Sequence, residues 1–253
     1  MEFLSYLISG ISLGSVYAII ALGYTMVYGI AKMLNFAHGD VIMIGGYVSF
    51  CAMFYLGLPN IVAVLLAVIV CTVLGVVIER LAYKPLRSAP RMSVMISAIG
   101  VSYLLQQVAQ LAWTSNPKSF ISVVSGLKPI SLFGGQLTIS AETVVTIIAC
   151  IVIMVVLIWF VNNTPAGHAM LAVSEDRGAA QLMGVNVNAT ISLTFAIGSA
   201  LAAVAGALLC SSYPTLQPTT GAMPGIKAFV AAVFGGIGSI PGAFLGGILL
   251  GII

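Results

Sequence analysis

The chain has 253 residues, of which 60% are hydrophobic and 6% are charged, and its formal net charge is +3. Soluble domains carry roughly 25% charged residues, so nine basic and six acidic side chains cannot cover a chain of this length with a water-compatible surface. The composition therefore excludes a soluble protein. The few positive charges also do not form the basic stripe that nucleic-acid binding requires.

The charged residues are separated by long apolar runs, which predict membrane-spanning helices. Such a helix needs about 20 apolar residues, and a charge at the bilayer centre costs at least ~2.5 kcal/mol. Lipid offers no partner for backbone groups, and the runs lack barrel-like alternation, so only helices fit. We expect an all-α, polytopic transmembrane helical bundle of seven or eight helices. Their predicted ranges are 4–30, 40–57, 60–83, 93–113, 139–161, 190–211, 225–236 and 242–253, the last two read as one helix broken at 235–242.

The loop after the third predicted helix indicates the orientation of the chain. Four cations lie within 78–91, and short loops rich in Lys and Arg remain in the cytoplasm. Counting helices from this loop places the N-terminus and loop 114–138 outside and loop 162–189 inside. The four cations are Arg80, Lys84, Arg87 and Arg91.

Two short helices are predicted in the cytoplasmic loop 162–189. Thr164 followed by Pro165 is typical of a helix start, with Thr as the N-cap and Pro at the first helical position. Ser174 can cap a second helix, whose first turn then holds the acidic pair 175–176 against its positive end.

The second of these helices has the pattern of a docked element. Ala179, Leu182 and Met183 fall on one face, and Gly184 stands where a helix C-terminus favours left-handed backbone. So short a helix does not persist alone in water, so it must pack against something. The residues leave two interpretations open, which are an interfacial helix packed on its own protein and a docking element for a cytoplasmic partner.

Polar residues in or beside the predicted helices are candidates for a translocation path. Because lipid cannot pair with polar groups, they face protein or a water-filled cavity at membrane depth. Those within 93–113 lie on roughly one face and either bond to other helices or line a path. At 35–40, Asp40 is expected to cap the next helix, and its polar neighbours to satisfy backbone groups or contact substrate. The candidates are Ser12, Asn35, His38, Ser97, Ser102, Gln106 and Gln110.

Glycines near the end of the sequence predict close packing. They recur every four residues, a spacing that lets two helix backbones approach, which makes the region a candidate helix or subunit interface. The interface candidates are Gly238, Gly242 and Gly246.

The sequence lacks patterns for chemistry of its own. It has no G-x-x-x-x-G-K-[ST] phosphate loop, so ATP hydrolysis is expected on a partner. Its two histidines and four isolated cysteines predict no metal site. An intramembrane hydrolase needs a nucleophile with a base or a metal, and no motif for either is present. A gradient-driven carrier needs membrane-buried charges, whereas Glu79 and Glu142 lie near predicted helix ends.

Several long segments resemble one family. The segments 14–40, 78–88, 96–106 and 227–252 are similar to the branched-chain amino-acid permeases of ATP-binding-cassette importers, the LivH-like subunits. Segment 164–186 resembles the coupling loop of such permeases, in which a short helix with an Ala-Ala-x-x-x-Gly core fits a groove on the ATPase.

The coupling-loop resemblance can be stated residue by residue. Ala179, Ala180 and Gly184 match the core of the motif. The sequence departs from it at Gly178, where Glu is common, and at 168 and 171, where relatives carry Arg, so small-residue packing is retained and electrostatic contacts are in doubt. The coupling residues implied are Glu175, Asp176, Ala179, Ala180, Leu182, Met183 and Gly184.

The resemblance implies partners and a location. A second homologous permease subunit, two ATP-binding subunits, an extracytoplasmic substrate-binding protein and membrane lipid are expected, and no nucleic acid. This chain would be a transport subunit without catalytic residues or a bound cofactor, and ATP and Mg would bind the ATPase partners. It would lie in the bacterial plasma (inner) membrane and carry branched-chain or related amino acids, with urea, amides or other amino acids as alternatives.

Residues 1–253 are expected to form a single transmembrane permease domain that contains the coupling loop 162–189. The sequence stops inside an apolar run without a cap or polar tail, so the natural chain is expected to continue beyond Ile253.

Overall fold

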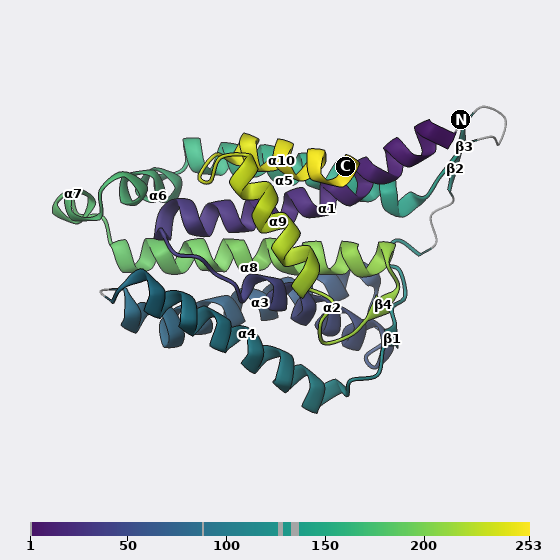
Figure 1. Cartoon of the computed structure of the whole chain (residues 1–253), viewed down its shortest axis with the longest axis horizontal. Helices are drawn as coiled ribbons and strands as arrows, with labels where there is room; N and C mark the ends of the chain where they lie inside the picture. The colour runs from purple at the N-terminus through teal and green to yellow at the C-terminus, as the bar shows by residue number, and fades with distance from the viewer. Residues whose placement is uncertain (1, 88, 126–128, 133–136) are drawn as a thin grey trace.

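The computed structural model is a bundle of helices with two very small sheets at one end (Figure 1). It describes residues 2–87, 89–125, 129–132 and 137–253. The bundle helices are α1 (Glu2–Ala31), α2 (His38–Phe54), α3 (Asn60–Ile78), α4 (Arg91–Trp113), α5 (Ala141–Asn163), α8 (Val187–Ser212), α9 (Ala222–Phe234) and α10 (Ile240–Ile252). The shorter elements are η1 (Glu79–Tyr83), η2 (Lys84–Leu86), α6 (Pro165–Glu175), α7 (Arg177–Leu182), β1 (Lys118–Ser119), β2 (Ile130–Leu132), β3 (Leu137–Ile139) and β4 (Thr215–Leu216).

Every predicted helix is present near its predicted position, because the apolar runs and their breaks are local features of the sequence. Within the described residues, five helices are long and apolar enough to cross a membrane. They are Phe3–Ala31, Asn60–Leu86, Met92–Trp113, Ala141–Asn163 and Val187–Ser212. Helices α2, α9 and α10 are also apolar but shorter, with 17, 13 and 13 residues. The chain is therefore an all-α, polytopic transmembrane bundle.

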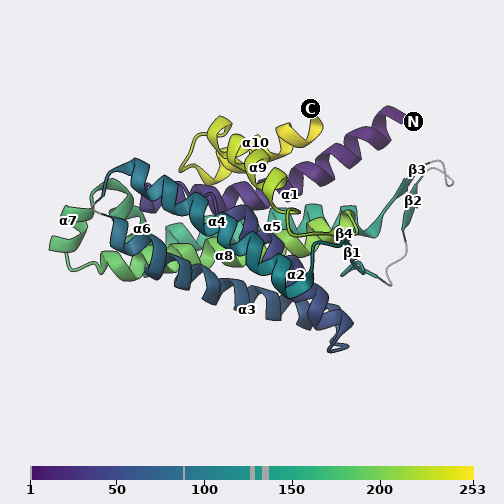
Figure 2. The same cartoon turned by 60° about the horizontal axis from the view of Figure 1, so that its bottom comes forward.

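The connecting segments gather at the two ends of the bundle as the predicted orientation requires. At one end, η1 and η2 lie near α6 and α7, and the guanidinium of Arg87 donates to Oδ1 of Asn188 at the start of α8. At the other end, β1 pairs antiparallel with β4, and the amide of Asn60 donates to the Val123 carbonyl at 2.6 Å. Figure 2 shows the two groups at opposite ends. The alternation of ends from helix to helix agrees with the count from the cationic loop.

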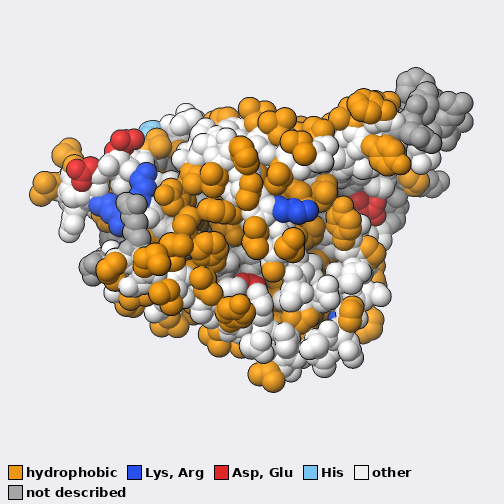
Figure 3. All heavy atoms as spheres, viewed as in Figure 1, with side chains coloured by type: hydrophobic (Ala, Val, Ile, Leu, Met, Phe, Trp, Pro, Cys, Tyr) orange, Lys and Arg blue, Asp and Glu red, His pale blue; other side chains and the backbone are white. Residues whose placement is uncertain are grey.

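Helices α1 and α8 form the buried centre, and the outer helices present apolar side chains outward. Residues 16–22 of α1 and most of α8, including Phe195, are buried. Large apolar side chains such as Leu111 of α4 and Trp159 of α5 are exposed, as lipid contact allows. Figure 3 shows hydrophobic side chains across the viewed face, with charged ones mostly near α6 and α7.

The glycine-rich residues 235–239 form a tight turn that joins α9 and α10 into a hairpin. Gly242 and Gly246 of α10 lie against the backbone of Gly235 and Ala231, so a side chain at either glycine would clash with main chain. Gly238 belongs to the turn, with φ of 102°, and lies beside Gly29 of α1. The close contact that involves the three interface candidates therefore lies within this chain.

A separate contact holds the hairpin on α1. Gly247 of α10 packs on Ala18, and Gly251 packs on Gly14, so the two backbones meet with only small side chains between them. Helix α10 thereby covers α1 along a second glycine face, whose two members are also four residues apart.

Helix α2 begins inside the bundle rather than at the end where α1 stops. After α1 ends, residues 32–37 run back along the bundle, and α2 starts at His38. The His38 ring fills the space where a side chain on Gly23 of α1 would stand, and it also lies near Gly198 of α8. At 1.5 Å per residue, those glycines lie about 12 Å and about 17 Å from the cytoplasmic ends of their helices. The first turn of α2 therefore lies inside the bundle, beside interior turns of α1 and α8, and not at the end where α1 stops.

The orientation can be tested with single cysteines at Ser115 and Gln181, which are exposed at opposite ends of the bundle. In a background with Cys51 replaced by Ala, a membrane-impermeant maleimide should label position 115 in intact cells. Position 181 should react only after the membrane is opened. The converse pattern would show that the chain runs the other way across the membrane.

Candidate functional site

Helices α6 and α7 project from the end of the bundle that the cationic loop predicts to be cytoplasmic. As predicted, Thr164 caps α6, its hydroxyl accepting from the Gly167 amide at 3.0 Å, and Pro165 is the first helical residue. The prediction that Ser174 caps the second helix is wrong. Asp176 is the N-cap of α7, and its carboxylate accepts from the amides of residues 178 and 179 at 2.7 and 3.1 Å. Ser174 and Glu175 still belong to α6, because that helix continues until Asp176 turns the chain.

The outer face of α7 is apolar and exposed. Leu182 is 90% exposed and Met183 is 84% exposed, and Ala179 is also exposed on this side. Gly184 follows with φ of 86°, the left-handed backbone that ends a helix. The coupling candidates Glu175, Asp176 and Gly184 are likewise exposed.

Ala180 does not belong to that face. It is only 4% exposed and is turned toward the chain's own core, where its carbonyl accepts from the Val185 amide at 3.0 Å. Ala180 therefore differs from the exposed coupling candidates in packing on its own chain, and its part in docking stays a prediction. A six-residue helix must bury one side on its own protein to stay folded, and Ala180 is on that side.

Arg177 anchors α7 to the bundle. Its guanidinium donates to the carbonyl of Ala31, the last residue of α1. It also lines, together with Arg87, a cavity of about 400 Å³ at this end of the bundle. Burial, followed by the nearby charge of Arg87, lowers the pKa of Arg177 from its ordinary value. Helix α7 is thus attached directly to the end of a central membrane helix.

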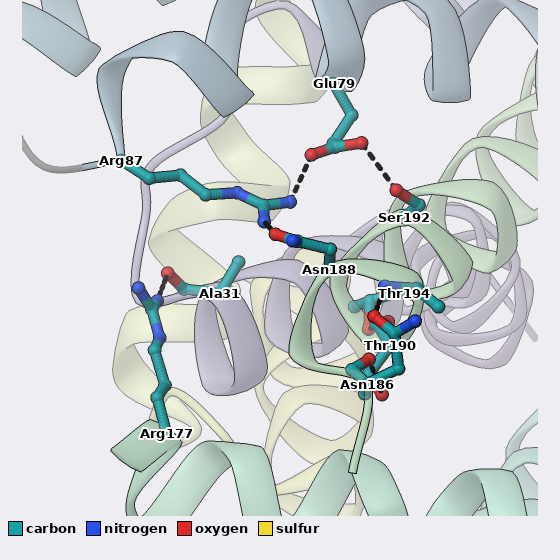
Figure 4. Close-up of polar contacts among 10 residues, drawn as sticks. Ala31, Glu79, Arg87, Arg177, Asn186, Asn188, Thr190, Ser192 and Thr194 are labelled. Carbon is teal, nitrogen blue, oxygen red and sulfur yellow. Dashed lines mark hydrogen bonds and ion pairs between the residues drawn. The ribbon is translucent and has the colours of Figure 1, made fainter. Parts of the chain in front are cut away.

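A buried ion pair lies beside this anchor (Figure 4). The carboxylate of Glu79, which is 0% exposed, accepts from the Arg87 guanidinium on one oxygen and from the Ser192 hydroxyl at 2.6 Å on the other. Arg87 also donates to Asn188, so it joins the segment after α3 to α8. Sequence reasoning used Arg87 only for orientation and Glu79 only as a residue near a helix end. Each of the two also bonds to α8, a contact with residues more than one hundred positions further along the chain.

A second polar site lies at membrane depth, between α2, α4 and α9. The prediction that Asp40 caps α2 is wrong, because the N-cap is Ala37 and Asp40 lies within the first turn. Asp40 is 2% exposed, and its Oδ1 accepts from Nε2 of Gln106 at 2.9 Å. Gln106 also lies 3.4 Å from the Ser102 hydroxyl. These three polar residues line a cavity of about 300 Å³.

The remaining path candidates are not part of this cavity. Ser97 donates to the carbonyl of residue 82 at 3.3 Å, and Gln110 lies farther along α4, half-buried. Asn35 accepts from the Tyr83 hydroxyl at 2.7 Å, and His38 packs between α1 and α8. Ser12 lines a different cavity near the outer end of the bundle. The structure therefore brings together only Ser102 and Gln106 of the predicted path, and adds Asp40.

Lys227 is a charged residue that sequence reasoning passed over. It is exposed on α9, and its ammonium lies 5.7 Å from the centre of the Tyr17 ring, halfway along α1. The available signal was its isolation, since no other Asp, Glu, Lys, Arg or His occurs within 178–253. It lines the cavity on the other side of α9 from Asp40.

A polytopic bundle with an exposed apolar helix anchored at one end and a polar cavity between its helices has the features of a membrane transport subunit. The family described as the permease component of branched-chain amino acid transport systems matches residues 6–253. The chain belongs to this family of importer permeases. It is a multi-pass protein of the bacterial inner membrane that acts in transport rather than as an enzyme, and it works with other subunits of a transport system.

Named relatives align over nearly the whole chain. The high-affinity branched-chain amino acid transport system permease protein BraD of Pseudomonas aeruginosa is 44% identical over 263 residues, covering 99% of this chain and 85% of the relative. LivH of Escherichia coli K12, which has the corresponding description, is 43% identical and covers 100% and 85%. A probable branched-chain amino acid transport permease of Methanocaldococcus jannaschii is 30% identical and covers 92% and 74%. No solved structure matches the chain.

Proposed function

We propose that this chain is one of two permease subunits of an ATP-driven importer that carries branched-chain aliphatic amino acids into the cell. The observation that carries the proposal is the exposed apolar face of α7 on the cytoplasmic side. Leu182 and Met183 contact water there, although burying each such side chain stabilises a protein by about 1.5–3 kcal/mol. A face of this kind, held on an anchored helix, fits a groove on a partner that drives transport.

The attachment of α7 explains how a partner could drive the membrane helices. A force on the docking face passes through Arg177 to the end of α1 and through residues 183–186, which follow α7 in the chain, to the start of α8. These are the two central helices of the bundle. Closure of ATP-binding partners would therefore move the core rather than a peripheral loop.

The partners form part of the proposal. They are a second homologous permease subunit, two ATP-binding subunits that hold ATP and Mg, an extracytoplasmic substrate-binding protein, and lipid around the exposed apolar helices. Residues 1–253 would act as one permease domain, with 162–189 as its coupling loop. This chain itself would hold no cofactor.

The substrate class is inferred from the relatives' names and from the cavity. The printed descriptions of the relatives specify branched-chain amino acids. The cavity beside Asp40 joins polar groups to the apolar side chains of Ile99, Ile226 and Phe229. An aliphatic amino acid needs both kinds of contact, whereas urea and small amides have no aliphatic side chain to place on the apolar part.

Reconstitution tests the proposal. The chain, its partner permease and the two ATP-binding subunits would be placed in liposomes, with the binding protein and radiolabelled leucine on the outer side. We expect ATP-dependent uptake that excess isoleucine or valine suppresses and excess urea or acetamide does not. The purified chain alone should hydrolyse no ATP. Uptake of urea but not leucine, or ATP turnover by the isolated chain, would contradict the proposal.

A further inference from the structure

Asp40 is an acidic side chain at membrane depth without a matching cation. It is buried in the first turn of α2, and among the described residues it forms no ion pair. An acidic residue within a membrane costs at least ~2.5 kcal/mol on insertion scales, so its presence there indicates a function. The helix dipole partly offsets this cost, because the positive end of α2 favours a negative charge in its first turn.

The surroundings of the carboxylate are suited to an organic cation. One oxygen accepts from Gln106, which leaves the carboxylate able to accept further hydrogen bonds. The cavity is also lined by the aromatic rings of Tyr24, Phe36, Tyr103 and Phe229. Aromatic faces attract a desolvated ammonium group through their negative π-surface, in addition to the direct pull of a carboxylate. Carboxylate, amide and aromatic rings together form a set of acceptors for a primary ammonium.

The rest of the cavity limits the size and nature of the ligand. Its volume of about 300 Å³ is at the lower end of the ~300–1,000 Å³ range of ligand pockets, so it suits a small molecule. Ile99 of α4 and Ile226 of α9 supply apolar surface beside the polar groups. The site therefore accommodates a short aliphatic chain that ends in an ammonium group.

We infer that Asp40 binds the α-ammonium of the amino acid during its passage through the membrane. Gln106 and Ser102 lie next to the carboxylate, and the aromatic rings line the same cavity. The inference rests on the proposed function and specifies one of its substrate contacts. In this arrangement Asp40 contacts the substrate directly, and Gln106 positions the carboxylate through the 2.9 Å hydrogen bond. The aliphatic side chain of the substrate lies against Ile99 and Ile226.

A purely structural role for Asp40 makes a different prediction. If its task were only to join α2 to α4 through Gln106, an amide side chain of the same shape would serve, because Asn also offers a carbonyl oxygen to the Gln106 donor. Binding an ammonium needs the negative charge. Asp40→Asn therefore separates the two roles while it keeps the size and the acceptor.

The test uses the complete reconstituted importer after leucine uptake by the wild type has been established. Asp40→Asn should reduce the rate of ATP-driven leucine uptake at least about tenfold, the loss expected for a charge-assisted hydrogen bond in a dry site. Assembly and basal ATPase activity should be retained, and Asp40→Glu should restore part of the uptake. Glu142→Gln is the matched control, since it neutralises a carboxylate at the outer end of the bundle and should leave uptake within about twofold. Wild-type uptake with Asn at position 40 would overturn the inference.

A second measurement does not depend on the folding of the variant. Isopentylamine has the aliphatic chain and ammonium of leucine without the carboxylate, and 4-methylpentanoate has the chain and carboxylate without the ammonium. With the binding protein saturated by leucine, the amine should inhibit uptake by the wild-type importer and the acid should not. Inhibition by the acid alone, or by neither compound, would contradict ammonium recognition. Failure of wild-type leucine uptake would instead refute the proposed function.

Discussion

Leu182→Asp is expected to abolish ATP-driven uptake without lowering the stability of the chain. Leu182 is 90% exposed and contacts almost nothing within the chain, so a polar residue there should change the free energy of unfolding by less than about 0.5 kcal/mol. At a docked face the same change places a charge in an apolar contact, where its desolvation is not compensated. Loss of co-purification with the ATP-binding subunits, with unchanged thermal unfolding of the chain alone, is the result expected.

Two further variants make this experiment decisive. Met183→Leu preserves an apolar side chain on the same face and should leave both assembly and uptake close to those of the wild type. Ala180→Arg should instead damage the chain itself, because Ala180 is buried and a long cationic side chain cannot be accommodated there. If Leu182→Asp assembles and transports normally, the ATP-binding partner docks elsewhere and α7 is only a surface helix.

Arg87→Met is expected to be the most destabilising single change at the cytoplasmic end. It leaves the carboxylate of Glu79, which is 0% exposed, without its counter-charge. Removing one partner of a buried ion pair typically costs about 3–5 kcal/mol. We therefore expect a lower unfolding temperature in detergent, which tryptophan fluorescence during heating measures. We also expect a smaller yield of folded protein after purification.

The double variant Glu79→Gln, Arg87→Met tests the cause of that loss. Gln keeps an oxygen that can accept from the Ser192 hydroxyl but removes the uncompensated charge, so it should recover much of the lost stability. Arg80→Met is the matched control, because Arg80 is exposed in the same segment and its removal should have little effect. If Arg87→Met and Arg80→Met unfold at the same temperature, the Glu79–Arg87 pair is not a stabilising element.

In the coupling loop, some features depend on neighbouring residues and can be predicted from the sequence, whereas others depend on contacts with distant residues. Thr164 and Pro165 could be read correctly as a helix start because capping depends on neighbouring residues. The boundary between α6 and α7 was misplaced by two residues, since both Ser174 and Asp176 are acceptable caps. The choice depends on where the second helix can pack, and Arg177 must reach the end of α1. For the same reason, the inward orientation of Ala180 was not evident from spacing alone.

The membrane character and the number and approximate ends of the helices could be predicted from the sequence alone, and the same patterns predict an orientation. These follow from the free energy of transferring short segments into lipid and from the charges of short loops, both of which are properties of neighbouring residues. The packing of the helices was needed to show that α2 starts inside the bundle, that Asp40 meets Gln106, and that Glu79 pairs with Arg87 beside α8. Those contacts depend on how the helices pack, and inside lipid a charged side chain must find its partner wherever the packing brings one.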